Sequence, residues 1–231
     1  TPLFLLQRIQ KDYFGSAVGI SGDVIVVGAY GEDGDNTIQL NNNAPFAGAA
    51  YVYERGTAGW VQEMYLKATN TNWGDRFGRS VAIDGDTIVV GAPEEDSKAT
   101  GVNGDQYDNS ASYSGAAYVF VKGGPTWFYA KQRAYVKSSN TGAHDEFGLS
   151  VGISGVTVVA GAYGEDSMST GVNGDQMNKS AYNAGAAFVF EHCLAVSEKI
   201  GRGCSSGSAP PALDITRPVV GQSSTVMVTG A

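Results

Sequence analysis

The sequence predicts an all-β protein, a β-propeller-like array of four-stranded antiparallel blades with three full repeats and partial blade elements at both ends. Three observations lead to this prediction. A segment of roughly 60 to 70 residues recurs three times, and short β-branched runs recur within each copy. No stretch of about ten or more residues shows helical periodicity together with capping residues.

Each copy of the repeat contains a Phe-Gly pair, a β-branched run that ends in Gly-Ala, and a Gly-Ala-Ala segment. The Phe-Gly pairs begin at Phe14, Phe77 and Phe147, which are 63 and 70 residues apart. The second and third copies share the run Thr-Gly-Val-Asn-Gly-Asp-Gln, at 100–106 and 170–176. Identical runs at a fixed offset indicate an internal duplication, and such repeats indicate stacked units of structure.

The second copy shows the expected elements in order. Residues 77–83 alternate with the period of a strand and end at the turn 84–86, which has the hairpin sequence Asp-Gly-Asp. Residues 87–90 form a β-branched run typical of a strand buried on both faces. Residues 115–121 and 127–136 are the third and fourth predicted strands.

The Gly-Ala pairs at 28–29, 91–92 and 161–162 fit the inner strands of such blades. Inner strands crowd toward a central axis, where residues without a large side chain allow backbones to approach one another.

A Phe-Gly pair followed by Gly-Ala-Pro resembles the FG-GAP repeat. The segment 91–93 matches the second half of that motif in full, whereas 28–30 and 161–163 carry Tyr in place of Pro. The resemblance covers roughly residues 12–190 and recurs three times in register. The family includes the integrin α-subunit propeller and many secreted bacterial proteins. The resemblance therefore implies a β-propeller, an extracellular or cell-surface location and, often, calcium in the loops of the blades.

Each repeat carries a long polar loop between its second and third predicted strands. Calcium takes six to eight oxygen ligands from carboxylates, amides and carbonyls, usually on a loop that contains glycine. Solvated turns, in which Asn, Asp and Gly serve the backbone, are the alternative. The candidate calcium ligands are Asp33 and Asp35 in the first loop, Glu95, Asp96, Asn103, Asp105 and Asp108 in the second, and Glu165, Asp166, Asn173 and Asp175 in the third.

A second acid stands two residues before each Phe-Gly pair, at Asp12, Asp75 and Asp145. Its simplest role is to accept backbone N–H groups in the turn that leads into the first strand. The alternative is a bridging ligand to a neighbouring loop.

The charge balance excludes several classes of partner. The chain has 15 Lys+Arg and 23 Asp+Glu, for a formal net charge of −8. This balance argues against nucleic-acid binding and against a polybasic membrane anchor. No window approaches the ~20 apolar residues of a membrane-spanning helix, so we expect no membrane insertion. The chain opens at Thr1 rather than Met, so we expect a leader to have been removed.

Cys193 and Cys204 are the two cysteines of the chain, and they lie in a polar, glycine-rich segment. We predict a disulfide between them, which would suit an extracellular or cell-surface location. Two buried thiols are the alternative.

No catalytic constellation stands out, so we predict that the chain is not an enzyme. Residues 148–152 match Gly-x-Ser-x-Gly, but the nucleophile elbow needs a strand-to-helix turn, and the repeat places this segment within a strand. His144 and His192 show no metal-ligand spacing. Trp60 and Trp127 stand at matched points before the fourth strand, where packing is the expected role.

We divide the chain into four parts. They are an N-terminal strand at 1–10 that completes a blade, three repeats within 11–192 (about 11–70, 71–140 and 141–192), a Cys-bounded loop and linker at 193–208, and C-terminal strands at 209–231. The predicted strands at 213–220 and 224–229 would form a partial blade, begin another domain or be donated to a neighbouring subunit. Three repeats fall short of the four to eight blades of most propellers.

Incomplete closure leads to the functional hypothesis. We expect a calcium-stabilised extracellular structural module that self-associates head to tail, forming a filament in its open form. A closed propeller that presents its loops to an extracellular protein or glycan, as an adhesion or ligand-binding domain, is the alternative.

Overall fold

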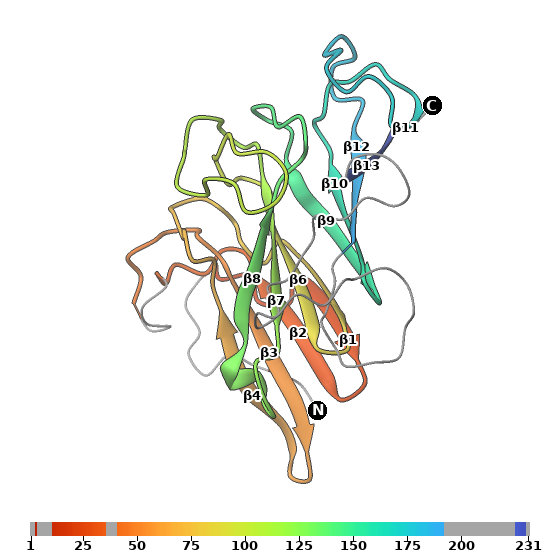
Figure 1. The fold of residues 1–231 in the computed structure, drawn as a ribbon. Coiled ribbons are helices and arrows are strands. Elements are labelled where there is room, and N and C mark those ends of the chain that lie inside the picture. Colours follow the sequence, from red (N-terminus) through yellow and green to blue (C-terminus); the bar gives the residue numbers. More distant parts are fainter. Residues whose placement is uncertain (1–2, 4–10, 36–40, 192–224, 230–231) are drawn as a thin grey trace, which may run out of the picture.

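The computed structural model describes residues 3, 11–35, 41–191 and 225–229. Its strands form three antiparallel sheets that lie side by side (Figure 1). The described part of the chain contains β-strands and one short 3-10 helix, and no α-helix. The predicted all-β fold of propeller-like, four-stranded blades is therefore confirmed, and the three blades do not close into a ring.

Each sheet corresponds to one repeat, and we number the sheets as blades 1 to 3. Blade 1 contains β1 (Ala17–Ser21), β2 (Val24–Ala29), β3 (Ala49–Gly56) and β4 (Gly59–Leu66), in that order. Blade 2 contains β5 (Ser80–Asp84), β6 (Thr87–Ala92), β7 (Ala116–Val121) and β8 (Lys131–Val136), with the 3-10 helix η1 (Trp127–Tyr129) before β8. Blade 3 has the order β9 (Phe147–Ser154), β10 (Thr157–Ala162), β12 (Ala186–Glu191), β13 (Thr225–Thr229) and β11 (Gly171–Val172).

The C-terminal strand β13 takes the fourth position of blade 3. It pairs antiparallel with β12, and the register sets Phe188 opposite Met227. In blade 2 the equivalent pair is Tyr118 opposite Tyr135. The strand thus completes a blade of its own chain. The predicted strand at 213–220, both cysteines and most of the predicted strand at 1–10 lie outside the described residues, so the disulfide stays a prediction.

Two predicted strand boundaries differ from those in the structure. In blade 2 the first strand begins at Ser80 rather than Phe77, because Gly78 takes a left-handed conformation with φ +86° and Phe77 bridges to Gly48 of blade 1. The start of the predicted fourth strand forms η1, and the strand itself begins at Lys131.

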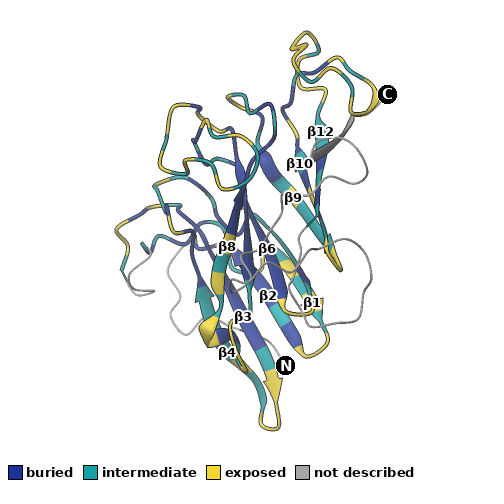
Figure 2. Cartoon of the chain, in the orientation of Figure 1, coloured by how far each residue is buried: buried dark blue, intermediate teal, exposed yellow. Residues whose placement is uncertain are grey.

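The hydrophobic core lies between the blades. Successive side chains along each strand point to opposite faces of its sheet. Buried residues fill the middle of the stack of sheets, whereas the tips of the hairpins are exposed (Figure 2). Phe77 packs against Tyr118, with ring centroids 5.4 Å apart, in the cluster between blades 1 and 2. Phe147 packs in the same way against Phe188, at 5.6 Å, in the cluster between blades 2 and 3. Trp127 is fully buried, which confirms its predicted packing role.

Glycines set the distance between the blades. A Cβ atom placed on Gly28 would lie 2.0 Å from the carbonyl oxygen of Gly78, and one placed on Gly91 would lie 1.9 Å from that of Gly148. Each Phe-Gly turn therefore rests directly on the Gly-Ala pair of the preceding blade. No side chain larger than hydrogen fits there without moving the backbone.

Candidate functional site

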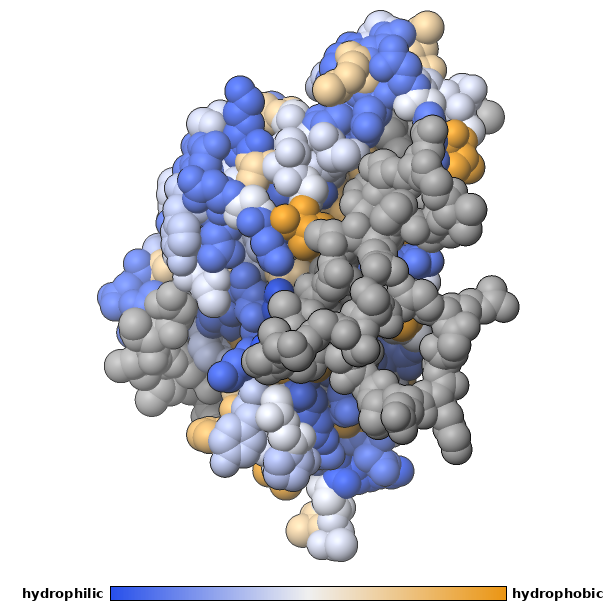
Figure 3. All heavy atoms as spheres, in the orientation of Figure 1, coloured by the Kyte–Doolittle hydropathy of each residue, from blue (hydrophilic) through white to orange (hydrophobic). Residues whose placement is uncertain are grey.

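The long polar loops of the three repeats leave the sheets at the same end of the molecule, away from the short hairpins (Figure 1). In the space-filling view this end presents mainly hydrophilic residues, with isolated hydrophobic ones among them (Figure 3). Each loop begins with a glutamate that is buried rather than solvated, at Glu32, Glu95 and Glu165.

The glutamate of blade 2 is held by four partners. Its Oε2 atom accepts hydrogen bonds from Lys137 Nζ at 3.0 Å, from the Tyr135 hydroxyl at 2.8 Å and from the Ser97 backbone N–H at 3.1 Å. Its Oε1 atom accepts one from Asn70 Nδ2 at 3.1 Å. The side chains of Glu95 and Lys137 are almost completely buried, so the ion pair is shielded from water.

Blade 1 repeats this arrangement. Glu32 Oε2 accepts hydrogen bonds from the Tyr65 hydroxyl at 2.6 Å and from the Gly34 backbone N–H at 3.1 Å, and Lys67 Nζ lies 3.5 Å away. Burial raises the pKa of the Glu32 carboxyl above its ordinary value and lowers the pKa of the Lys67 amine to about 8, although each group favours the charged form of the other.

Blade 3 obtains its ammonium group from a different element. Glu165 Oε1 accepts hydrogen bonds from Asn140 Nδ2 at 2.7 Å and from Lys179 Nζ at 3.0 Å. Lys179 lies in the loop itself. By register, the strand position of Lys137 corresponds in β13 to Thr229, so the fourth strand supplies no lysine in this blade.

Two of the three acids before the Phe-Gly pairs, Asp75 and Asp145, accept backbone N–H groups. Asp75 Oδ2 accepts a hydrogen bond from the Asn72 N–H at 2.8 Å, and Asp145 Oδ2 accepts one from the Gly142 N–H at 2.7 Å. These contacts match the simpler of the two predicted roles. Burial raises the pKa of the Asp75 carboxyl to about 8 and that of Asp145 to about 6.

Three predicted calcium ligands share one role at the junctions between loop and turn. The Oδ1 atoms of Asp33, Asp96 and Asp166 each accept a backbone N–H at 2.8 Å, from Phe46, Tyr113 and Asn183 respectively. These contacts join the start of each loop to its end.

The other candidate ligands also have local partners or fix the backbone. Three of the aspartates accept a hydrogen bond from the backbone N–H two residues further along: Asp105 from Tyr107, Asp108 from Ser110 and Asp175 from Met177. Asp35 accepts a hydrogen bond from Asn41 Nδ2, and Asn103 accepts one from the Tyr135 N–H. Asn173 has a left-handed backbone conformation with φ +55°.

The predicted calcium ligands do not gather into an acidic cluster in the described part of the chain. Among the described residues, no group of three or more His, Cys, Asp or Glu side chains is placed to hold a metal ion. The buried glutamates, which would be the strongest ligands, already contact lysine ammonium groups. Calcium therefore stays a prediction, and no part of the structural account depends on it.

Sequence reasoning missed the partners of the buried glutamates. A signal for them exists: Tyr65-Leu66-Lys67 and Tyr135-Val136-Lys137 stand 70 residues apart, as do Asn70 and Asn140. The period of the repeat marks these residues, but polar residues at the end of a strand carry no sign that they turn inward.

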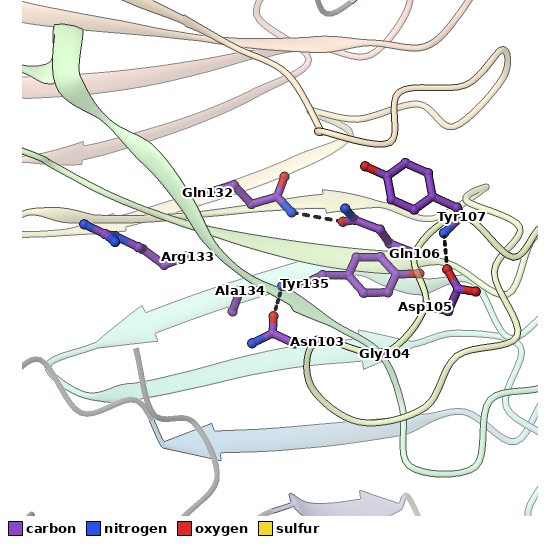
Figure 4. Close-up of a pocket in the computed structure, with 9 residues that line it drawn as sticks. All are labelled: Asn103, Gly104, Asp105, Gln106, Tyr107, Gln132, Arg133, Ala134 and Tyr135. Carbon is purple, nitrogen blue, oxygen red and sulfur yellow. Dashed lines mark hydrogen bonds between the residues drawn. The ribbon is translucent and has the colours of Figure 1, made fainter. Parts of the chain in front are cut away.

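A shallow polar hollow of about 370 Å³ lies at the outer edge of blade 2 (Figure 4). The loop segment 103–107 and the strand segment 132–135 line it. Gln132 Nε2 donates a hydrogen bond to Gln106 Oε1 at 3.1 Å, and the ring of Tyr107 is exposed. Side-chain amide groups therefore lie beside an exposed aromatic ring at this hollow.

The stacked blades and their Phe-Gly turns define a propeller-type repeat protein. A model of the FG-GAP repeat matches residues 9–53, 60–120 and 131–190, and the chain belongs to the FG-GAP repeat family. No curated protein matches the chain. Domains of this family are typically extracellular modules of structure or adhesion. Within the described residues, the structure contains no helix with the length and apolar character to cross a membrane.

Replacing the buried lysine of blade 2 is expected to destabilise the fold strongly. Lys137→Met leaves Glu95 buried without its ammonium partner, which costs about 3–5 kcal/mol of unfolding free energy. Chemical denaturation followed by circular dichroism measures the loss. Adding Glu95→Gln to this variant is expected to restore much of the stability. Asp23→Asn, which breaks the exposed pair with Arg55, is the control and costs at most about 1 kcal/mol. Equal losses in the two single variants would contradict this account.

Stability is expected to fall as the pH rises through the folded-state pKa values of the buried aspartates. Asp145 and Asp75 have pKa values of about 6 and about 8, raised by burial from the ordinary 3.8, so the folded protein holds protons that the unfolded chain releases. The contribution of these two carboxyl groups to the unfolding free energy is complete below their unfolded-state pKa and is lost as the pH rises toward 8. Melting temperatures measured across this range test the slope, and Asp75→Asn should flatten it. A melting temperature that rises with pH in the unmodified protein would contradict the assignment.

Proposed function

We propose that the chain is a noncatalytic, extracellular structural module that self-associates head to tail through its blade faces. One observation supports this most directly: the outer face of blade 3 keeps the features that receive the next blade at both internal junctions. In blade 2, the residues that contact blade 3 include Gly91, Ala117 and Val119. Their counterparts in blade 3 are Gly161, Ala187 and Val189, and no described blade covers these residues. Contacts of this kind generate rings when the rotation closes and filaments when it does not.

The noncatalytic part of the proposal follows from how the polar groups are used. The buried acids contact lysine, tyrosine, asparagine and backbone N–H groups, which are structural partners. The segment that resembles a nucleophile elbow, 148–152, lies within β9, so its Ser150 is not on a strand-to-helix turn. Membership of the FG-GAP family supports the extracellular location.

Size-exclusion chromatography with light scattering tests self-association. We expect the measured mass to exceed the 24.0 kDa of one chain as the concentration rises. A mass that stays at one chain up to the highest soluble concentration would contradict the proposal. It would favour the alternative, a ligand-binding domain that uses the polar hollow beside Tyr107.

Calcium stabilisation is the part of the proposal that rests on the sequence alone. Asp105 and Asp108, in the loop of blade 2, are among the candidates that form no described ion pair with a lysine. If calcium binds there, adding it to EDTA-treated protein at ten times the dissociation constant should increase the unfolding free energy by about 1.4 kcal/mol. The melting temperature should rise accordingly. Asp105→Asn combined with Asp108→Asn should abolish the rise. An unchanged melting temperature in the unmodified protein would remove calcium from the proposal.

A further inference from the structure

The two internal junctions are built from the same backbone contacts. At the first, the N–H groups of Arg76 and Phe77 donate to the carbonyls of Phe46 and Ala47, at 3.1 and 2.9 Å. At the second, the N–H groups of Glu146 and Phe147 donate to those of Tyr113 and Ser114, both at 3.0 Å. Each Phe-Gly turn thus adds, as a short parallel bridge, to the segment that precedes the third strand of the blade before it.

Side chains complete these junctions on the inner strands. Ile83 of blade 2 approaches the bare backbone of Gly19 in blade 1, where an added Cβ would lie 3.3 Å from the Ile83 methyl group and 3.1 Å from a methyl group of Val26. At the second junction, the hydroxyl of Ser80 donates to the carbonyl of Gly148 at 2.7 Å. At the first junction the receiving face offers a glycine and a valine, and at the second it offers a serine hydroxyl.

Blade 3 presents an uncovered receiving face. We define the trailing face as Ser150, Gly152, Val159, Gly161 and the segment 183–187. Val159 is 37% exposed, whereas its counterpart Val89 is 0% exposed beneath blade 3. The three atoms nearest to a Cβ placed on Gly161 all belong to Ser150 of the same blade, whereas one on Gly91 would meet Gly148 of the next blade. A hollow of about 430 Å³ lies over this face, lined in part by Ser150, Gly161 and 183–187.

The inserting face of blade 1 is exposed along β1, whereas its outer part around Tyr51 and Tyr53 is buried. We define the leading face as the segment 13–15 with Val18 and Ile20. The side chains of Val18 and Ile20 are 68% and 66% exposed on β1, whereas Ile83, the counterpart of Ile20 in blade 2, is 9% exposed. Leu3 packs against the cluster around Val27 and Tyr51, on the outer part of the same blade face. The apolar side chains of β1 itself remain exposed.

We propose that the leading face of one copy docks on the trailing face of a second copy and reproduces the internal junction. The inference rests on the proposed function and names its interface. Ile20 would lie on Gly152 beside Val159, as Ile83 lies on Gly19 beside Val26. The Ser150 hydroxyl would donate to the Gly15 carbonyl, as the Ser80 hydroxyl donates to that of Gly148. The N–H groups of 13 and 14 would pair with the carbonyls of 183 and 184.

The number of copies follows from the number of blades. The described residues of each copy form three blades, and propellers close with about four to eight. Six is the one multiple of three in that range. If the junction between copies has the geometry of the internal ones, two copies close a six-bladed ring through two identical head-to-tail junctions.

Substitutions on the two faces test this interface. Ile20→Lys on the leading face and Val159→Lys on the trailing face each place a charge in both junctions of the ring. We expect light scattering to give about 48 kDa for the unmodified protein and about 24 kDa for each variant. The matched control is Val61→Lys on β4, where the valine is also exposed but lies on neither face, and it should keep the dimer. A cooperative thermal unfolding transition in each variant confirms that it folds, at a melting temperature lowered by the loss of the partner.

Mixing the two variants tests the head-to-tail character. The Ile20→Lys copy keeps an intact trailing face, and the Val159→Lys copy keeps an intact leading face. Their mixture should recover a species of two chains through one intact junction, which a symmetric interface would not allow. If the unmodified protein is a monomer, the proposed function and this inference both fail. If it assembles and both variants assemble equally well, self-association stands but this interface is wrong.

Discussion

The close approach of two backbones at each blade junction is the constraint on which the rest of the structure depends. A Phe-Gly turn lies on a glycine of the preceding blade at less than the distance that a Cβ atom needs. This contact brings the phenylalanine into the core between the sheets and fixes the spacing of the blades. It also brings the aspartate before the turn into the interior, where its carboxyl binds a backbone N–H group. The residues of the repeat motif are thus the residues that form the contact between neighbouring blades.

The buried ion pairs hold the loops in place relative to these joints. Glu95 lies three residues after the end of β6 and contacts Lys137, the residue that follows β8, so the pair connects the ends of the second and fourth strands of one blade. Asn70, which follows the fourth strand of blade 1, binds the same glutamate and joins the two blades. Because the ammonium and amide donors come from elements far apart in sequence, Glu95 ties its loop to the assembled stack, in addition to the local contacts within the loop.

Much of the fold could be predicted from the sequence, because the repeat, the strand period and the Gly-Ala pairs are local signals. The sequence does not decide among three roles for the fourth strand of blade 3, since this strand joins β12 only after a long intervening segment and has no Tyr-x-Lys motif. The acidic loops were interpreted by composition, and composition does not reveal that Asp33, Asp96 and Asp166 accept backbone N–H groups. Lysines 67 and 137 were missed because burial of a charge depends on a partner about 35 to 42 residues away.

The most direct test of the account is the stability cost of one methyl group at a joint. Gly91→Ala adds a Cβ atom 1.9 Å from the carbonyl oxygen of Gly148, whereas Gly56→Ala adds one at an exposed strand end whose nearest neighbour is 3.9 Å away. Both glycines lie in strands and have no positive φ, so the backbone conformation is matched. Denaturant unfolding should show a loss of about 1–3 kcal/mol for Gly91→Ala and little change for Gly56→Ala. Equal stabilities of the two variants would contradict the claim that bare backbone contact sets the blade spacing.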